Sequence, residues 1–324
     1  MLHVLLVLAN DISNTGGIER HCSNIIDLFQ NDSMIKIDYL CKERILYKYN
    51  RILQKNIWNC KQLQDIIIKY DVIHIHGFAD FFVGQALKIA IKQNKRVVYT
   101  PHFHPFMMLR RPILGKVFFD FYIRKFLQNI NIIIAINKED KAFFDRYNTN
   151  VLMIPNWLTG IEKLEIKRTS NMILAVGRND FNKGLYHLNK IPFDSYEVHC
   201  VTDNSEGLDK RIIIHSNVSD KELSLLYSKA ALLVIPSRYE AFSYVALEAL
   251  ERGTPVLMSE RVRIYDHIEG LNGVERFRFG NMDDFVSKIQ TTINGDVNIK
   301  YVQDFFSCNK IKGLLRSVYF NEEV

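Results

Sequence analysis

The feature that most constrains the fold of this chain is a repeated alternation of short apolar runs with segments of helix length. The runs are continuously apolar rather than alternating with polar residues, which is typical of strands in a parallel sheet covered on both faces. In the first half the expected strands are 3–9, 36–40, 72–76, 96–100, 131–136 and 151–154, and the expected helices are 18–30, 79–93, 115–128 and 138–146. Repeated strand–helix units of this kind predict a doubly wound α/β domain.

A second series of the same kind follows a break in the pattern. Segment 155–171 carries proline, glycine and charges with little periodicity, and we interpret it as an interdomain linker. Beyond it, the expected strands are 172–177, 196–201, 211–215, 231–236 and 255–258, with helices at 219–229 and 241–252. The length of 324 residues suits two domains. We therefore predict two Rossmann-like domains, 1–157 and 158–304, with a cleft between them, followed by a final segment, 305–324.

Composition narrows the class of protein further. Hydrophobic residues make up 48% and charged residues 24% of the chain, which is ordinary for a globular protein. The five cysteines are scattered and form no C-x-x-C pair, so the sequence predicts neither a disulfide framework nor a zinc site and fits a reducing cytoplasm. No segment approaches ~20 uninterrupted apolar residues. We expect a cytoplasmic protein that is soluble or peripheral to the membrane.

The net charge of +6 is unevenly distributed. Up to Trp157 there are 21 Lys and Arg against 13 Asp and Glu, a balance of +8, and the remainder has 21 against 23, a balance of −2. A basic front half suggests that one domain faces an anionic surface. The alternative is a general compositional bias towards Ile, Lys and Asn. The basic residues follow no recognised nucleic-acid reading motif, so we expect no nucleic-acid partner.

The strongest group of candidate site residues lies in PSRYEAFSYVALEALERGTPVLMSE (236–260). Glu240 follows an expected strand, a helix is expected from about Ala241, and Glu248 would lie two turns further on nearly the same face. Free N–H groups at the start of the helix could hold a diphosphate, and the carboxylates could accept hydrogen bonds from sugar hydroxyls. The alternative is a helix with an acidic first turn and an ordinary solvated glutamate.

Three further loops that carry candidate site residues follow expected strands: 175–184, 9–20 and 97–105. AVGRNDFNKG (175–184) places Arg178 and Lys183 where they could neutralise two phosphates, although a solvated basic turn is the alternative. In ANDISNTGGIER (9–20) the Gly16-Gly17 pair allows backbone amides to approach a phosphate, but the pattern is not G-x-G-x-x-G.

In VVYTPHFHP (97–105) His102 directly follows an expected strand, where it could bond a sugar hydroxyl or move a proton. His74, His76 and His104 also lie near strand ends, and for each histidine a packing or surface role is the alternative. Their spacing along the chain does not predict a metal site.

Taken in order, these motifs resemble family 4 of the nucleotide-sugar glycosyltransferases, which have the two-domain GT-B fold. The resemblance is diffuse in the front half, where it rests on GGIER, DVIHIHG, YTPH and IPN. It is dense from AVGR through GTPV and returns at FFSCNKIKGLLRSVY (305–319), which is similar to the family's closing helix that crosses back to the first domain.

The resemblance implies a role for each matching position. Arg178 and Lys183 would bind the donor diphosphate, Glu240 would bind the transferred sugar and Glu248 would bind the ribose. The amides of Ala241, Phe242 and Ser243 would lie near the phosphate and sugar. Gly17 would close over the diphosphate, and His102 would lie beside the sugar. The chain departs from the family in having Ala241 and Ser243 where glycines are usual, and Trp157 where a glycine commonly follows IPN.

The resemblance also implies a retaining transfer that needs no metal or other cofactor, because the two cations supply the charge that a metal ion provides elsewhere. We expect a hexose or N-acetylhexosamine donor, with a UDP-sugar favoured and a GDP-sugar next. Segment 103–126 interleaves aromatic residues with Arg110, Arg111, Lys116, Arg124 and Lys125, which suits contact with anionic lipid, although a buried helix with basic flanks is the alternative.

With a membrane-linked acceptor, the enzyme would act on a lipid-linked saccharide in O-antigen, capsule or lipopolysaccharide assembly. Two other classes stay open. A nucleotide-sugar epimerase or hydrolase of the same fold would turn over the donor without an acceptor. A non-catalytic sugar-binding subunit would be expected to have lost some of Arg178, Lys183, Glu240 and Glu248, and all four are present.

Overall fold

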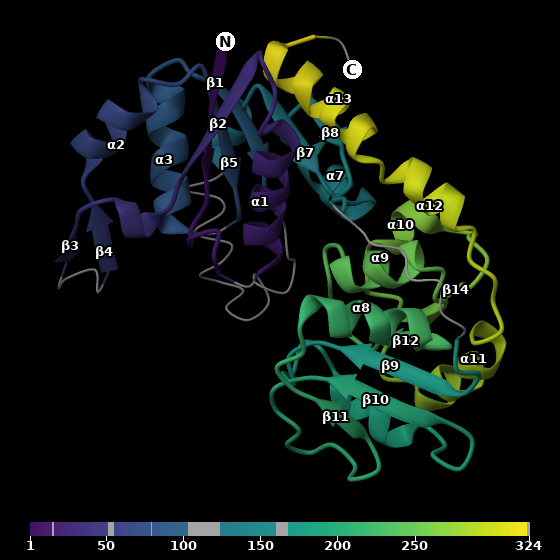
Figure 1. The fold of residues 1–324 in the computed structure, drawn as a ribbon. Coiled ribbons are helices and arrows are strands. Elements are labelled where there is room, and N and C mark those ends of the chain that lie inside the picture. The colour runs from purple at the N-terminus through teal and green to yellow at the C-terminus, as the bar shows by residue number, and fades with distance from the viewer. Residues whose placement is uncertain (15, 51–54, 79, 103–123, 160–167, 323–324) are drawn as a thin grey trace. The chain divides into compact units, whose positions relative to one another are not determined.

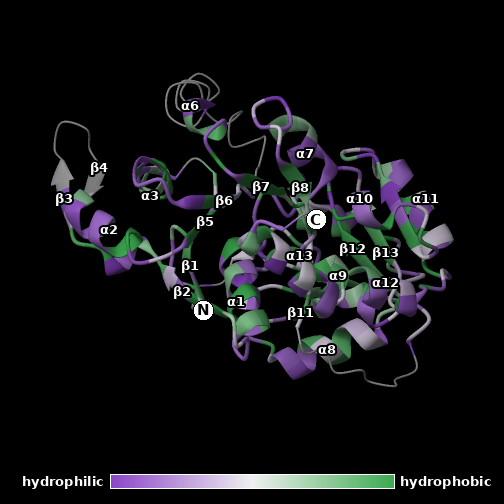
Figure 2. Ribbon diagram, turned by 90° about the horizontal axis from the view of Figure 1, so that it is seen from above, coloured by the Kyte–Doolittle hydropathy of each residue, from purple (hydrophilic) through white to green (hydrophobic). Residues whose placement is uncertain are grey.

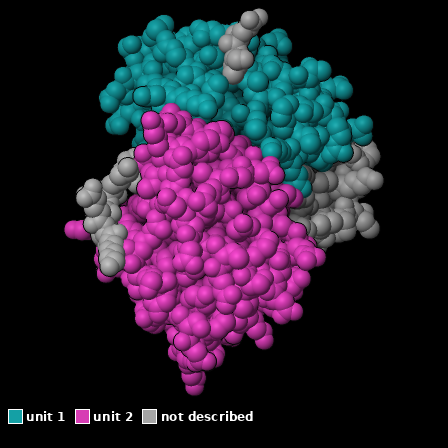
Figure 3. Space-filling view, turned by 90° about the vertical axis from the view of Figure 1, so that its right-hand side faces the viewer, with its two compact units in different colours: residues 1–159, 308–324 teal, residues 160–307 magenta. Residues whose placement is uncertain are grey.

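The computed structural model describes two compact units, each built around its own parallel sheet (Figure 1, Figure 3). Unit 1 comprises residues 1–159 and 308–324, and unit 2 comprises residues 160–307. The described residues are 1–14, 16–50, 55–78, 80–102, 124–159 and 168–322. The division between the units falls within three residues of each boundary expected from the sequence.

The sheet of unit 1 has six described strands in the order β2-β1-β5-β6-β7-β8, and all of them run parallel. Their bounds are β1 Leu2–Val7, β2 Ile35–Leu40, β5 Val72–His76, β6 Arg96–Thr100, β7 Ile132–Ala135 and β8 Val151–Met153. The helices are α1 Gly17–Phe29, α2 Cys60–Ile67, α3 Phe81–Lys92, α6 Arg124–Leu127, α7 Lys138–Phe144, α13 Cys308–Phe320 and the 3₁₀ turn η1 Lys42–Arg44. A two-stranded antiparallel hairpin, β3 Tyr47–Asn50 with β4 Lys55–Trp58, was not expected from the sequence.

The strands of unit 1 are continuously apolar because both faces of the sheet are buried, as the sequence predicted. Side chains that alternate along β1 enter two different cores: Leu5 and Val7 lie in one, and Val4 and Leu6 lie in the other. The first core includes residues of α2, α3 and α7, and the second includes residues of α1 and α13. Figure 2 shows the central strands mostly in the green of hydrophobic residues.

Helix α13 completes the second core of unit 1 although it is the last helix of the chain. Leu315, Val318 and Tyr319 are buried there. The hydroxyl of Tyr319 lies 2.9 Å from Nδ1 of His74 on β5, and the guanidinium of Arg96 donates to the carbonyl of Val318. The closing helix therefore belongs to the same packing unit as the first strand.

Unit 2 repeats the architecture with described strands in the order β11-β10-β9-β12-β13-β14, again all parallel. Their bounds are β9 Met172–Val176, β10 Glu197–Val201, β11 Ile213–His215, β12 Leu232–Ile235, β13 Val256–Ser259 and β14 Val274–Phe277. The helices are η3 Leu185–Lys190, α8 Asp220–Lys229, α9 Tyr244–Glu251, α10 Tyr265–Ile268, α11 Met282–Thr292 and α12 Ile299–Phe305. The α/β class predicted from the strand–helix alternation is confirmed.

Two expectations need correction. The segment interpreted as a linker begins inside the core of unit 1, since Trp157 is fully buried there and its carbonyl accepts a 2.8 Å hydrogen bond from Asn24. The helix expected over 241–252 begins only at Tyr244. Most of the helix expected over 115–128 lies outside the described residues. No helix in the described part of the chain combines the length and apolarity needed to cross a bilayer.

Candidate active site

Two loops of unit 2 bring the predicted cation and carboxylate together at the carboxyl ends of β9 and β12. Nζ of Lys183 lies 2.8 Å from Oε1 of Glu240, and the Ser237 hydroxyl donates to the same oxygen at 2.6 Å. The side chains of Lys183 and Glu240 are 23% and 10% exposed. The pair is therefore partly shielded from water, where the attraction between opposite charges is stronger than at an open surface.

Direct hydrogen bonds hold these two loops against each other. The N–H of Arg238 donates to the carbonyl of Asn182 at 2.6 Å, and the side-chain amide of Asn182 donates to the carbonyl of Tyr239 at 3.0 Å. Gly184 permits this approach, because it has φ of +64° and an added Cβ would lie 2.3 Å from the carbonyl oxygen of Pro236. A residue with a side chain cannot occupy that position without moving one loop away from the other.

We therefore expect Gly184→Ala to lower the free energy of unfolding by about 2–4 kcal/mol, through left-handed strain together with the clash against Pro236. Gly207→Ala is the matched control, because Gly207 also has positive φ, +75°, but no atom lies within 4 Å of its added Cβ. Urea unfolding of both variants gives the comparison. Equal losses would show that the contact with Pro236 does not matter.

The turn that carries Lys183 is fixed by Asp180. One carboxylate oxygen of Asp180 accepts hydrogen bonds from the N–H groups of Asn182 and Lys183, each at 2.9 Å. The aliphatic part of Lys183 lies over Gly177, whose added Cβ would be 3.4 Å from Cδ of Lys183. Arg178 differs, since its side chain is 82% exposed and 3.5 Å from Asp180. Lys183 is thus held in place, whereas Arg178 extends into solvent at the same end of β9.

Glu240 does not belong to helix α9, so the expected two-turn spacing to Glu248 is wrong. Its N–H donates to the carbonyl of Arg261 at 3.2 Å and its carbonyl accepts from Arg263 at 2.9 Å, which forms an isolated parallel bridge. The helix begins three residues later than expected because Ser243 caps it: its hydroxyl accepts from the N–H of Ala246. Serine is a preferred N-cap residue.

Glu248 lies one turn into α9 and is held by a residue that sequence analysis missed. The hydroxyl of Tyr227, on α8, donates to Oε2 of Glu248 at 2.7 Å. Arg252 binds the carbonyl of Glu248 at 2.8 Å and the hydroxyl of Ser224 at 3.0 Å. The hydrogen bond between Tyr227 and Glu248 joins α8 to α9, and β12 separates these helices in the sequence. No local motif therefore points to Tyr227.

The three residues between Glu240 and α9 differ in their surroundings. Ala241 is half-buried, and Ser243 is buried with its hydroxyl used in capping. Phe242 is a packing residue, with its ring 6.1 Å from that of Phe306 and 6.2 Å from that of His267. Its side chain therefore anchors the loop, and only its backbone is available for the predicted phosphate contact.

In unit 1, Gly17 begins α1 and is exposed, and no atom lies within 4 Å of an added Cβ. Gly16 is the more constrained of the two glycines, because the carboxylate of Glu19 folds over it and an added Cβ would lie 2.0 Å from Oε2. Glu19 accepts from the side-chain amide of Asn10 at 2.9 Å, and Lys42 donates to Asn10 at 2.6 Å. This network, which sequence analysis missed, fixes the loop that leads into α1.

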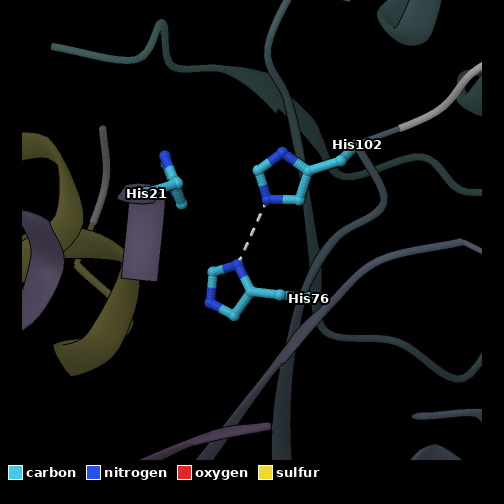
Figure 4. A group of neighbouring side chains, drawn as sticks. All are labelled: His21, His76 and His102. Atoms are coloured by element: carbon cyan, nitrogen blue, oxygen red, sulfur yellow. Dashed lines mark hydrogen bonds between the residues drawn. The ribbon is translucent and has the colours of Figure 1, made fainter. Parts of the chain in front are cut away.

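His102 is half-buried beyond the end of β6 and has left-handed backbone, with φ of +47°. Its Nε2 lies 3.4 Å from Nδ1 of His76, at the end of β5 (Figure 4). His21, on the second turn of α1, faces both, with ring centroids 5.4 Å from His76 and 4.9 Å from His102. Three histidines far apart in sequence thus form one cluster, which spacing along the chain did not predict.

The basic residues proposed to contact a membrane are only partly described. Arg124 and Lys125 are exposed on α6, with the Arg124 guanidinium 5.6 Å from the centre of the Tyr147 ring and the Lys125 ammonium 5.1 Å from that of Phe126. Arg110, Arg111 and Lys116 lie outside the described residues.

Comparison with known proteins gives matches in both units. Residues 15–158 match the family model "Glycosyltransferase Family 4", and residues 201–302 match "Glycosyl transferases group 1". An uncharacterized 41.2 kDa protein of the cps region of Klebsiella pneumoniae is 29% identical over 80% of this chain and 82% of its own length. The O-antigen chain mannosyltransferase RfbU of Salmonella typhimurium is 29% identical over 54% of this chain and 59% of its own length.

Solved structures extend the likeness to the fold of the whole chain. HepE of Anabaena, solved in complex with UDP and glucose, has a TM-score of 0.71 at 14% sequence identity and covers 99% of this chain and 100% of its own. At this identity the likeness establishes a shared architecture of two Rossmann-like units.

Proposed function

Because this chain belongs to family 4 of the glycosyltransferases and has the GT-B fold, we propose that it transfers a hexose or N-acetylhexosamine from a nucleoside-diphosphate sugar to a lipid-linked saccharide. A UDP-sugar is the favoured donor and a GDP-sugar is next. The acceptor would be an intermediate of O-antigen, capsule or lipopolysaccharide assembly. The proposal for the acceptor is supported by the names of relatives, an O-antigen chain mannosyltransferase and a protein of a cps region.

The observation that carries this proposal is the partly shielded pair of Lys183 and Glu240, with Arg178 at the same end of β9. A diphosphate carries the negative charge that two cations can bind. When the donor binds, its phosphate would replace Glu240 as the partner of Lys183. The Glu240 carboxylate would then be free to accept hydrogen bonds from the hydroxyls of the transferred sugar.

The same arrangement supports a transfer that needs no metal ion. As the bond between sugar and phosphate breaks, negative charge grows on the leaving nucleoside diphosphate, and fixed positive groups lower the energy of that state. Lys183 and Arg178 would supply this charge. The leaving phosphate would help to remove the proton of the acceptor hydroxyl on the same face of the sugar, so that the anomeric configuration is retained.

The remaining predicted residues would position the donor. Glu248, held by Tyr227, would accept hydrogen bonds from the ribose hydroxyls. The backbone of Ala241, Phe242 and Ser243 would lie near the phosphate and sugar. In unit 1, Gly17 would close over the diphosphate and His102 would lie beside the sugar. Arg124 and Lys125, both exposed, would contribute to a peripheral contact with anionic lipid.

A thermal-shift screen against UDP, GDP, ADP, CMP and their sugar conjugates tests the donor site. One nucleoside diphosphate is expected to raise Tm, because a ligand at 100 times its Kd stabilises the folded state by about 2.7 kcal/mol. Lys183→Ala should lose this response. Lys288→Ala is the matched control, since Lys288 also pairs with a carboxylate of unit 2, Asp284 at 3.9 Å. A response that survives in Lys183→Ala would contradict the assigned donor site.

Incubation of the purified protein with the stabilising donor, with and without lipid-linked saccharide, separates the reaction classes. Transfer that depends on the acceptor supports the proposal. Donor hydrolysis or epimerisation at full rate without acceptor would instead identify a nucleotide-sugar hydrolase or epimerase. Tight donor binding with no turnover under either condition would identify a sugar-binding subunit.

A further inference from the structure

The cluster of His21, His76 and His102 in unit 1 has the geometry of a metal-binding site. One ring nitrogen from each histidine lies within 4.8 Å of the other two. Figure 4 shows the three rings approaching a common space from different elements. The cluster belongs to unit 1 alone, because α1, β5 and the segment directly after β6, which carries His102, are all parts of that unit.

The distance between two of the nitrogens matches a coordination tetrahedron. Zinc binds histidine nitrogen at about 2.0–2.1 Å, which places two ligand nitrogens of a tetrahedral ion about 3.4 Å apart. Nδ1 of His76 and Nε2 of His102 are 3.4 Å apart, a distance that is long for a hydrogen bond. His21 would complete the set by a shift of about an ångström of its ring towards the other two.

Polar atoms around the cluster are unsatisfied, which points to a ligand. His21 is 2% exposed, and within the described part of the chain neither of its ring nitrogens makes a hydrogen bond of ordinary geometry, although the side chain of Asn156 is near enough to raise its pKa slightly. Nε2 of His76, Nε1 of Trp157 and Oδ1 of Asn156 likewise make no such hydrogen bond among the described residues. Buried polar groups are normally hydrogen-bonded, so several orphans around one point suggest an ion or water that satisfies them.

The protonation state of the cluster is the one that a metal requires. Burial lowers the pKa of His21 to about 4, and burial together with the neighbouring histidines lowers the pKa of His76 and His102 well below the usual value. Histidine binds metals as the neutral imidazole. At neutral pH, no proton has to be displaced from these rings.

We propose that His21, His76 and His102 bind a divalent transition-metal ion of the zinc class, with water or hydroxide in the fourth position. Three imidazole nitrogens favour Zn²⁺, Co²⁺, Ni²⁺ or Cu²⁺ over Mg²⁺ and Ca²⁺, which prefer oxygen ligands. The left-handed backbone of His102 is consistent with a ligand site, because residues with such strained backbone concentrate where ligands bind.

These ligands belong to unit 1, whereas the proposed donor cations Arg178 and Lys183 belong to unit 2, and we assign the ion no role in the transfer itself. Its expected effect is inhibition. A nitrogen of His102 that binds the metal is no longer available to the sugar, and this consequence rests on the role of His102 in the proposed function. The unpartnered second nitrogens of His21 and His76 predict an affinity roughly 10–100-fold below that of a site with a complete set of supporting acceptors.

Equilibrium dialysis with Zn²⁺ and visible absorption with Co²⁺ test the site on the whole chain without donor. We expect one ion per chain in this site and the intense visible bands of tetrahedral Co²⁺. His21→Gln and His76→Gln should each weaken Zn²⁺ binding at least tenfold, and near-ultraviolet circular dichroism of each variant checks that it is folded. The matched control is His199→Gln. His199 and His215 of unit 2 have ring nitrogens 2.8 Å apart and are an alternative pair of histidines at which a metal ion could bind.

Absence of Zn²⁺ binding at millimolar concentration, or binding that survives in folded His21→Gln and His76→Gln, would overturn the proposal. The first result would mean that buried water alone satisfies the cluster, and loss of binding in His199→Gln alone would place the ion in unit 2. Inhibition is measured separately, as a loss of transfer on adding Zn²⁺ that EDTA reverses. If the chain shows no transfer at all, the proposed function fails while the binding result stands.

Discussion

Replacement of Lys183 by alanine is expected to reduce the rate of sugar transfer by roughly 100- to 1,000-fold, the effect typical of losing one group that stabilises charge in a transition state. Lys183 is held by Asp180 and Gly177 at the end of β9, so its ammonium is preorganised next to Glu240. Arg178 is too exposed to compensate, because its side chain is 82% accessible to solvent. Steady-state assays with varied donor concentration give kcat and KM for the comparison.

The design must separate lost chemistry from lost stability. Lys183→Ala leaves the carboxylate of Glu240 with only Ser237 as a described side-chain partner, which should cost about 1–3 kcal/mol. In the double variant Lys183→Ala/Glu240→Gln the unpaired charge is gone, so most of this stability should return. Activity should not return, because neither the cation nor the carboxylate is present.

Lys288→Ala should keep near-normal kcat and KM, as expected for an ion pair that the donor does not use. Urea unfolding of all three variants accompanies the kinetics. The assignment of Lys183 would be wrong if Lys183→Ala turned over normally while folded, or if the double variant recovered activity together with stability.

The α/β architecture could be predicted because local patterns, the alternating apolar runs and helix-length segments, determine it. Each expected strand of the two sheets overlaps an observed one, since a strand buried on both faces needs a continuous apolar run, as in β5 and β12. Strand β14 escaped because its sequence, Val274-Glu-Arg-Phe277, has two charged residues between its apolar ends and so lacks a continuous apolar run. The β3–β4 hairpin escaped for a similar reason: its polar, lysine-containing strands lack the apolar run.

Individual residues of the candidate site could be predicted from local motifs, but the contacts between them could not. Lys183 and Glu240 were expected from separate loops, and their 2.8 Å contact depends on Gly184, whose positive φ lets the loops meet. Tyr227 had no signal of its own, because its hydrogen bond to Glu248 depends on how α8 packs on α9. The histidine cluster was missed because it depends on the order of strands in the sheet.

Lowering the pH from 7 to 5 is expected to destabilise unit 1 by at least about 2 kcal/mol. His21, His74, His76 and His102 are all buried, and burial is the main reason that the pKa of each lies below its usual value. The unfolded chain binds protons at these positions near pH 6.5, whereas the folded chain does not. Their stabilising contribution is therefore complete above pH 6.5 and is lost as the pH falls towards the lowered values.

His21 sets the scale, because its pKa of about 4 implies a loss of about 2 kcal/mol at pH 5, at 1.36 kcal/mol per pH unit below 6.5. The other three shifts act in the same direction. Unit 2 contains groups of both signs: burial raises the pKa of Glu251 to about 7, so that its protonation favours the folded form, whereas burial lowers the pKa of His187 and of His215. Because these shifts in unit 2 partly offset one another, acid should weaken unit 1 more than unit 2.

Tryptophan fluorescence isolates this effect, because the only two tryptophans of the chain, Trp58 and Trp157, both belong to unit 1. Urea unfolding followed at pH 7, 6 and 5 should show a midpoint that falls steadily with pH. His21→Gln should reduce the slope, since glutamine cannot be protonated, and His199→Gln in unit 2 should not change it. A midpoint independent of pH between 7 and 5 would mean that the cluster takes up protons without unfolding, and that burial does not hold these histidines neutral.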